Sequence, residues 1–391
     1  MISREELWQL ANFECQAGDE LAISFYFQPG APRDKSHREE SILAKDLVRN
    51  SLRELGLNGR SREAMKDLEN LLRMAEALRG NSARAKAVFA CASRRLWKEY
   101  ELPPTSMPTR LLLNRRFHLK PLATVFSEYP LVWIACIDRQ SARFYELQFD
   151  EIRNVGLLSN PQPRHGRSDG YAGYDGGHAQ RHVDDEARRH FRQAAEILKN
   201  AAEKKQFEAL VIACQDVNWP DLQGQLHPYV QKRLLGRFVP AAGVMSEERI
   251  RLETERVKRE ALVRHREGLI RETLDEARAN GRGATGLRRV LRALELGEVD
   301  KLIMTHDYMA RAVECTSCKH LDSHIVPYCP LCGRATRELE DVCESLVPAA
   351  MRNHIGLILT PAMDSLDQVG NIAAMLRFRA DRSTNQLRAA S

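Results

Sequence analysis

The most distinctive segment of this 391-residue chain reads Asp175-Gly-Gly-His-Ala-Gln-Arg-His-Val-Asp-Asp-Glu-Ala-Arg-Arg-His-Phe191. Two glycines, Gly176 and Gly177, come directly before a helical pattern that is rich in arginine and histidine. Glycine adopts φ > 0 without steric cost and lets a partner approach the backbone closely. The helix start offers free N–H groups and the positive end of the helix dipole, which suits a phosphate or a developing oxyanion. The segment therefore predicts a phosphate- or RNA-binding loop, and a flexible surface loop is the alternative.

The glycine pair lies near the end of a long predicted loop over residues 159–178, which is rich in glycine and proline. Loops of this length are uncommon inside a compact domain and are usually functional or disordered. The helix that follows carries four arginines that are candidates for contact with RNA backbone: Arg181, Arg188, Arg189 and Arg192. Three neighbouring acids, at positions 184–186, offset part of this positive charge.

Strand and helix patterns on both sides of this segment predict a multidomain α/β (α+β) fold. In the middle of the chain we expect strands at 131–137, 142–149 and 209–214, and helices at 179–205 and near 226–236. Towards the N-terminus we expect strands at 22–27 and 87–91, and helices at 37–55 and 62–78. Towards the C-terminus we expect helices at 246–279, 286–296 and 337–347, and strands at 299–305 and 355–359. Proline clusters and changes of pattern then predict three domains, at 1–117, 118–244 and 245–391.

Composition excludes several classes of protein. Hydrophobic residues make up 43% and charged residues 29%, which is typical of a globular chain and not of collagen, a disordered tail or a coiled-coil rod. The longest apolar run, residues 131–137, is too short to cross a bilayer, and residues 1–6 lack the apolar core of a signal peptide. We therefore expect a cytoplasmic protein without a membrane partner. The net charge of +6 is compatible with RNA binding but does not establish it.

Four of the nine cysteines form two pairs, Cys315-x-x-Cys318 and Cys329-x-x-Cys332. Each pair brings two thiolates close enough for one tetrahedral ion, and four sulfur ligands leave no open position. The spacing therefore predicts a structural Zn²⁺ site, with an iron–sulfur centre or a redox pair as the alternatives. Gly333 follows the second pair, as a tight turn requires, and we interpret His320 and His324 as surface residues.

The other five cysteines are scattered singly along the chain. Three of them lie in apolar runs, such as Leu210-Val-Ile-Ala-Cys214, where cysteine behaves as a small hydrophobic residue. An odd total with one clustered quartet argues against a disulfide framework and indicates a reducing compartment.

Taken together, these features resemble the superfamily of archaeal and eukaryotic class-1 peptide release factors and Pelota, and most closely its bacterial members. The resemblance rests on the glycine pair with Gln180-Arg-His and the later Arg-Arg, on the helix–turn–strand segment Gly286–Met304, and on the zinc ribbon at 315–332. It is looser at Ile23–Pro29 and Phe117–Leu122. The resemblance implies a middle domain whose Gly-rich loop enters the ribosomal peptidyl transferase centre, and an L7Ae-like C-terminal domain with an inserted zinc ribbon.

Two departures from the family pattern bear on function. His178 stands where the family has glutamine, but Gln180 gives the spacing Gly177-x-x-Gln180, which resembles the Vms1-like release factors that act on stalled peptidyl-tRNA without a stop codon. The N-terminal domain contains no Asn-Ile-Lys-Ser, the motif with which the classical factors read stop codons. The bacterial relative Balon instead occupies the A site of idle ribosomes. The resemblance therefore implies either a rescue factor that hydrolyses peptidyl-tRNA or a non-catalytic hibernation factor.

The resemblance also implies roles for individual residues. Gly176 and Gly177 would give access, a backbone N–H near His178 would stabilise the oxyanion, and Gln180 would position the attacking water. His178 as a general base is one interpretation, and contact with rRNA phosphate or solvent is the other. The implied partners are the ribosome, through rRNA and P-site peptidyl-tRNA, and a translational GTPase, with the chain acting as a monomer. A generic RNA-binding or scaffold protein with a zinc ribbon is a third interpretation.

Overall fold

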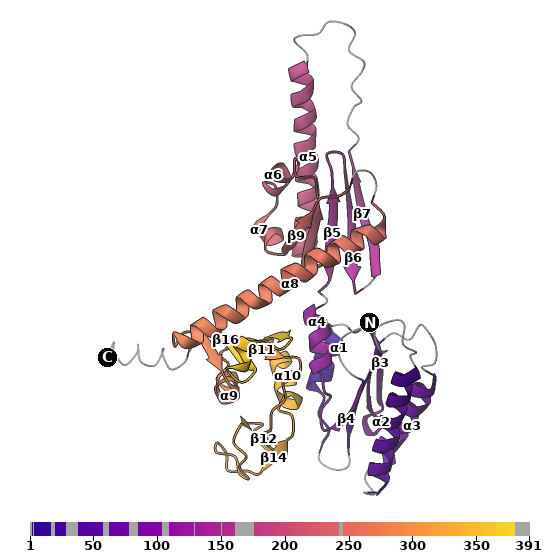
Figure 1. The fold of residues 1–391 in the computed structure, drawn as a ribbon, viewed down its shortest axis with the longest axis vertical. Coiled ribbons are helices and arrows are strands. Elements are labelled where there is room, and N and C mark those ends of the chain that lie inside the picture. The colour runs from indigo at the N-terminus through magenta and orange to yellow at the C-terminus, as the bar shows by residue number, and fades with distance from the viewer. Residues whose placement is uncertain are drawn as a thin grey trace, which may run out of the picture. The chain divides into compact units, whose positions relative to one another are not determined.

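The computed structural model describes residues 2, 4–16, 20–28, 38–57, 62–77, 85–103, 109–128, 130–149, 151–160, 176–241 and 245–379. The fold is a mixed α/β arrangement, as predicted, with four sheets among the described residues (Figure 1). The chain divides into two compact units, here called unit 1 (residues 1–127 with 268–391) and unit 2 (residues 128–267). The division into three domains at 1–117, 118–244 and 245–391 stays a prediction.

Unit 2 is built on a five-stranded sheet in the order β7-β6-β5-β8-β9. The strands are β5 (Val132–Ile137), β6 (Ser141–Gln148), β7 (Glu151–Ser159), β8 (Ala209–Ala213) and β9 (Leu234–Phe238). Strands β5, β8 and β9 run parallel, and β6 and β7 continue the sheet in antiparallel pairs. Because β7 is antiparallel to β6 and β6 to β5, strands β5 and β7 end at the same edge of the sheet.

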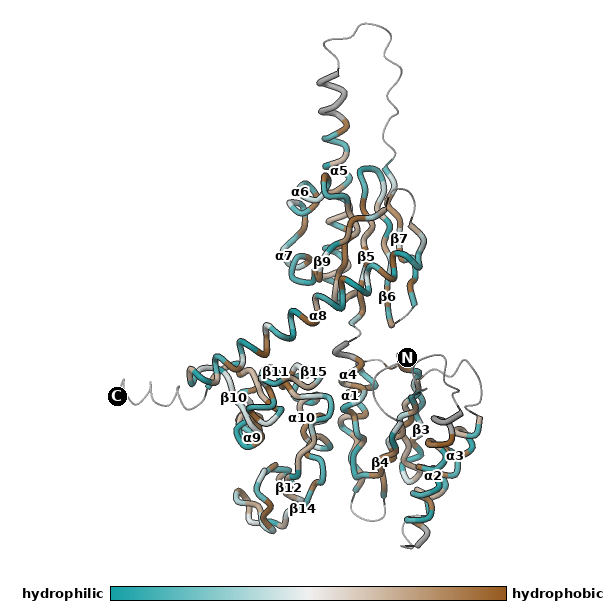
Figure 2. Tube along the Cα trace, viewed as in Figure 1, coloured by the Kyte–Doolittle hydropathy of each residue, from teal (hydrophilic) through white to brown (hydrophobic). Residues whose placement is uncertain are grey.

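Helices bury both faces of this sheet. On one face, Trp133 and Phe144 share a core with Phe191 and Leu198 of helix α5 (Gly176–Glu203) and with the short helices α6 (Trp219–Gln223) and α7 (Pro228–Gln231). On the other face, Ile250 and Val257 of helix α8 (Glu247–Arg278) pack on the alternate strand residues. Helix α8 is largely hydrophilic with hydrophobic residues at intervals, as expected for a helix with one buried side (Figure 2). Among the described helices, none combines the length and the apolar character that crossing a membrane requires.

Most predicted elements of unit 2 are confirmed to within a few residues, two are corrected, and one strand was missed. The helix predicted near 226–236 is wrong, because the chain forms only the single turn α7 and then strand β9, which pairs with β8. A short apolar run is compatible with either a strand or a helix. Here the residues form a strand because they can pair with the free edge of β8. Strand β7 was not predicted, and α5 begins at Gly176 instead of 179. The glycine pair, which was predicted to lie near the end of the loop, therefore opens the helix.

The N-terminal part of unit 1 is an antiparallel sheet in the order β3-β2-β1-β4. Its strands are β1 (Ala22–Phe27), β2 (Ala85–Cys91), β3 (Leu96–Leu102) and β4 (Arg110–Asn114). Helices α2 (Arg38–Leu57) and α3 (Arg62–Ala77), both predicted, cover the face that carries Ile23, Phe25 and Phe27. The opposite face carries Tyr26 and Phe89, which pack with residues from α1 (Arg4–Asn12) and α4 (Lys120–Glu128).

The C-terminal part of unit 1 contains a four-stranded sheet in the order β10-β16-β11-β15. Its strands are β10 (Gly283–Thr285), β11 (Val299–Thr305), β15 (Gly356–Thr360) and β16 (Ile372–Leu376). Helices α9 (Leu287–Glu295) and α10 (Cys343–Arg352) contribute to the core on one face. The last turns of α8 and the short helix α11 (Asp364–Asp367) pack on the other.

A small three-stranded sheet, here called the ribbon, joins β11 to α10. It has the order β13-β12-β14, with β12 (Ala312–Cys315), β13 (Leu321–Asp322) and β14 (Thr336–Leu339). The helix predicted at 337–347 is therefore wrong: its first residues continue strand β14, and the helix begins only at Cys343. Pairing of β14 with β12 over residues 336–339 outweighs the local helical pattern.

A buried ionic cluster connects the two parts of unit 1. Arg116, only 3% exposed, donates hydrogen bonds to Glu314 at 2.6 Å and to Ser345 at 2.7 Å, and lies 3.0 Å from Glu14. Glu314 accepts a second bond, 2.8 Å long, from Arg337. A single hydrophobic core also contains residues from both parts of the chain. Because burying a charge is costly unless the charge is paired and hydrogen-bonded, these contacts hold the ribbon against the N-terminal segment.

We expect Arg116→Lys to lower the free energy of unfolding by about 1–2 kcal/mol, because an ammonium group cannot reproduce the planar fork that serves three partners. Arg311→Lys is the matched control, since Arg311 pairs with Glu338 at 2.9 Å with both side chains exposed. Such a surface pair contributes little, so the control should change stability by under about 0.5 kcal/mol. Urea denaturation measures both. Equal effects would show that the buried cluster does not anchor the ribbon.

Candidate functional site

The four cysteines of the ribbon converge on one point. The Sγ atoms of Cys315 and Cys332 lie 3.4 Å apart, those of Cys318 and Cys329 lie 3.6 Å apart, and all four lie within 4.8 Å of one another. Four sulfurs placed about 2.3 Å from a zinc ion form a tetrahedron with edges of about 3.8 Å. The observed separations are close to that value. The cluster therefore fits a closed, four-coordinate metal site, as the spacing of the cysteines predicts.

Two matching backbone turns shape this cluster. The N–H of Lys319 donates to the carbonyl of Cys315 at 3.2 Å, and the N–H of Gly333 donates to that of Cys329 at 2.9 Å. Both residues adopt positive φ, +63° at Lys319 and +71° at Gly333, which confirms the tight turn predicted there. Burial disfavours ionisation of Cys315, but the N–H groups of Cys318 and Ser317 lower the pKa of its thiol to about 6. A thiolate is the form that binds metal.

The two histidines of the ribbon are not ligands of this cluster. His324 is 58% exposed and its Nδ1 lies 3.0 Å from Asp322, so the interpretation as a surface residue holds. His320 is only 13% exposed, and its Nδ1 lies 3.1 Å from Oε1 of Glu295 on α9. That interpretation is therefore wrong for His320, which connects the ribbon to helix α9.

The predicted Gly-rich loop lies mostly outside the described residues, which resume at Gly176. Gly176, Gly177, His178, Gln180 and Arg181 belong to the first turns of α5, and their side chains are also outside the described part of the chain. The first buried residue of α5 in the described part is Ala187. Figure 1 shows the N-terminal turns of α5 extending past the ends of the strands. The backbone of the glycine pair is thus carried away from the core of unit 2.

Side chains near the base of this extension hold α5 to the sheet. Arg139, in the β5–β6 turn, forms an ion pair with Asp184 of α5. Asn160, directly after β7, donates to Gln193 at 2.6 Å and lies 3.0 Å from Nδ1 of His190. Asn160, which precedes the segment 161–175, therefore contacts α5, the helix that follows this segment. No local sequence pattern indicates these contacts, because the partners lie 45 and 33 positions apart in the chain.

The predicted RNA-binding arginines have different surroundings. Arg188 is 57% exposed and lies 3.8 Å from Asp185 and 3.9 Å from Asp221. Arg189 is 68% exposed and lies 3.2 Å from Glu186, and Arg192 is exposed. Exposed pairs of this kind are weak, so all three guanidinium groups remain accessible to a partner. RNA binding by these residues stays a prediction. On the same helix His190 is buried.

Comparison with known proteins bears on unit 2 directly. Residues 118–259 match a family model described as "Bacterial archaeo-eukaryotic release factor family 10". Over these residues, the chain is similar to the bacterial archaeo-eukaryotic release factor family. The match includes the whole five-stranded sheet and helix α5, and it confirms the resemblance inferred from the motifs. Among curated proteins, none matches the chain.

Several solved structures are similar to this chain at low identity. The archaeal translation termination factor aRF1 is 16% identical over 96% of this chain and 99% of its own, with a TM-score of 0.25. Pelota from Archaeoglobus fulgidus is 13% identical over 96% and 93%, with a TM-score of 0.32. S. cerevisiae Dom34, described as a translation termination-like factor, is 10% identical over 96% and 93%, with a TM-score of 0.42. At these values the similarity carries no conclusion about function.

Proposed function

We propose that this chain is a ribosome-binding release or rescue factor of the cytoplasm. It enters the A site as a monomer and promotes hydrolysis of peptidyl-tRNA without requiring a stop codon. The observation that carries the proposal is the family match over residues 118–259, which contains the glycine pair at the start of α5. The supporting geometry is a helix that extends past the sheet and is tied at its base by Arg139 and Asn160.

The reaction is the attack of water on the ester that joins the peptide to tRNA. The ribosome supplies most of the orientation. Gly176 and Gly177 let the backbone enter a narrow RNA-lined site, and a free N–H of the first helical turn near His178 stabilises the oxyanion. Gln180 positions the water. The exposed arginines of α5 contact RNA backbone.

Unit 1 supplies binding surface in this proposal. Its C-terminal part is an L7Ae-like domain, in which the four cysteines hold a structural Zn²⁺ that stabilises the ribbon. A translational GTPase is the candidate partner for delivery to the ribosome. Zinc contributes no chemistry to hydrolysis, because four thiolates leave no position open for water.

The alternative is a non-catalytic hibernation factor that occupies the A site. The observation that favours it is His178, which stands where related release factors have glutamine. Two measurements separate the interpretations. Co-sedimentation with ribosomes distinguishes both from a scaffold protein that does not bind ribosomes. A peptide-release assay on stalled ribosomes then distinguishes hydrolysis from occupancy.

Binding to the ribosome should not depend on the codon in the A site, because the sequence has no stop-codon motif. We expect dissociation constants for stop, sense and empty A sites that agree within about threefold, or about 0.6 kcal/mol. Filter binding to programmed ribosomes measures them. A preference for a stop codon of about tenfold or more, or about 1.4 kcal/mol, would show that the N-terminal part decodes.

A further inference from the structure

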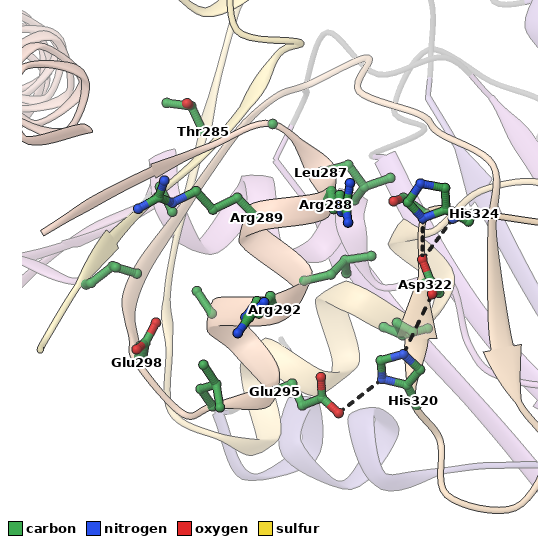
Figure 3. Close-up of a pocket in the computed structure, with 18 of the residues that line it drawn as sticks. Thr285, Leu287, Arg288, Arg289, Arg292, Glu295, Glu298, His320, Asp322 and His324 are labelled. Atoms are coloured by element: carbon green, nitrogen blue, oxygen red, sulfur yellow. Dashed lines mark hydrogen bonds and ion pairs between the residues drawn. The ribbon is translucent and has the colours of Figure 1, made fainter. Parts of the chain in front are cut away.

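A wide groove lies within unit 1, between helix α9 and the ribbon segment 320–324 (Figure 3). Its volume of about 1330 Å³ exceeds the roughly 300–1,000 Å³ of small-molecule sites, so it suits part of a macromolecule. The His320–Glu295 contact of 3.1 Å ties the ribbon wall to the helix wall. Figure 3 shows this contact at the C-terminal end of α9, and His324 near the other end. The groove therefore has two walls, helix α9 and the ribbon segment, and a side-chain contact connects them.

The exposed charge in this groove is positive. Helix α9 presents three exposed arginines, Arg288, Arg289 and Arg292. Within the described part of the chain, neither Arg288 nor Arg292 has an acidic side chain within 4.0 Å, and Arg289 reaches only the amide oxygen of Asn280, at 3.5 Å. Three guanidinium groups along one short helix thus lack a counter-charge.

The acidic residues of the groove do not neutralise these arginines. Glu295, the only acid of α9, contacts His320, and Asp322 lies 3.0 Å from His324. The third acid, Glu298, is only 6% exposed. The groove therefore presents guanidinium groups to solvent while its carboxylates face histidines or the protein interior.

We propose that this groove binds the phosphate backbone of RNA. The planar guanidinium fork matches phosphate geometry with two hydrogen bonds. Arg288 and Arg292 lie one helical turn apart, so both can contact successive phosphates of one strand. The apolar side chains of α9 do not compete for this surface, because Val290, Leu291 and Ala293 are buried. An acidic partner helix would need an exposed apolar stripe on α9, which these residues do not offer.

This inference goes beyond the proposed release reaction and uses none of its residues. Release depends on the start of α5 in unit 2, whereas the groove lies in unit 1. A chain that releases no peptide would still bind RNA here. Loss of RNA binding at the groove would likewise leave the chemistry of release untouched. A peptide-release assay therefore tests the first proposal, and RNA binding at the groove tests the second.

The test compares two pairs of substitutions in the full-length chain that change the net charge equally. Arg288→Ala with Arg292→Ala removes the groove cations, and alanine preserves the helix. Arg271→Ala with Arg278→Ala is the control, because both residues are exposed on α8 in the same unit. Fluorescence anisotropy with labelled uridine homopolymer RNA, over a series of KCl concentrations, gives the affinity and its salt dependence.

We expect the groove pair to weaken RNA binding at least tenfold and to reduce the slope of log K against log [KCl] by about 1–1.5. The control pair should change the affinity by less than twofold. Equal losses in the two pairs would assign binding to diffuse surface charge and overturn the proposal. Absence of RNA binding by the parent chain would do the same. So would polyglutamate that binds the parent chain more tightly than RNA does and loses this binding in the groove pair, because it would identify an acidic protein as the ligand.

Discussion

Gln180→Ala and Gly177→Ala are each expected to reduce peptide release on stalled ribosomes by about 10²–10³-fold, the usual cost of losing one contact to the reacting groups. Gln180→Ala removes the side chain that positions water. Gly177→Ala adds a methyl group where the backbone must enter an RNA-lined site. Single-turnover release of labelled peptide measures both effects.

Stability should not account for these losses. Gly177 lies in the first turns of α5, where alanine favours a helix over glycine by up to about 1 kcal/mol, so the thermal midpoint should stay the same or rise. Gln223→Ala is the matched control for Gln180→Ala, because Gln223 is exposed on α6 of the same unit. It should release peptide like the parent chain. Equal activity of Gln180→Ala and the parent would remove the catalytic role from Gln180, and no release by the parent would favour the hibernation factor.

Cys318→Ser is expected to abolish tight metal binding, whereas the parent chain should carry about one zinc ion. Structural zinc sites contribute about 10–16 kcal/mol of apparent binding free energy, and one missing thiolate breaks the closed set of ligands. The ribbon should then become sensitive to protease over residues 312–339. Metal analysis by mass spectrometry and limited proteolysis measure the two effects.

Cys214→Ser serves as the control for this prediction, because Cys214 is buried at the end of β8 in unit 2. It should keep the zinc ion even if it lowers stability. The ribbon contributes Lys319, which lies 2.6 Å from Glu14, and Glu314 of the buried cluster. Metal loss should therefore also lower the unfolding midpoint of unit 1. A parent chain without zinc, or with the absorbance of an iron–sulfur cluster, would contradict the assignment.

Local chemistry explains what the sequence by itself determined. The two Cys-x-x-Cys pairs specify a metal site because the spacing within each pair already brings two sulfurs together, and only the meeting of the pairs needed the fold. Strands such as Ala22–Phe27 and Val299–Thr305 were predicted because an apolar run of that length, bounded by turn residues, has few other buried conformations. The glycine pair with its following helix, the segment Gly286–Met304 and the paired cysteines together indicated the family that residues 118–259 match.

The tertiary structure decided everything that joins residues far apart in the chain. Arg116 and Glu314 are separated by 198 positions, and no local pattern distinguishes this buried pair from the many exposed ion pairs. Residues 234–238 became a strand because β8 offered a free edge, although the local pattern also permitted a helix. The two walls of the groove beside α9 meet at the contact between His320 of the ribbon and Glu295, which are 25 positions apart. Hydrophobic periodicity in the sequence indicates which side of a helix or strand is buried. The element that packs against this side is determined only when distant parts of the chain come together in the folded structure.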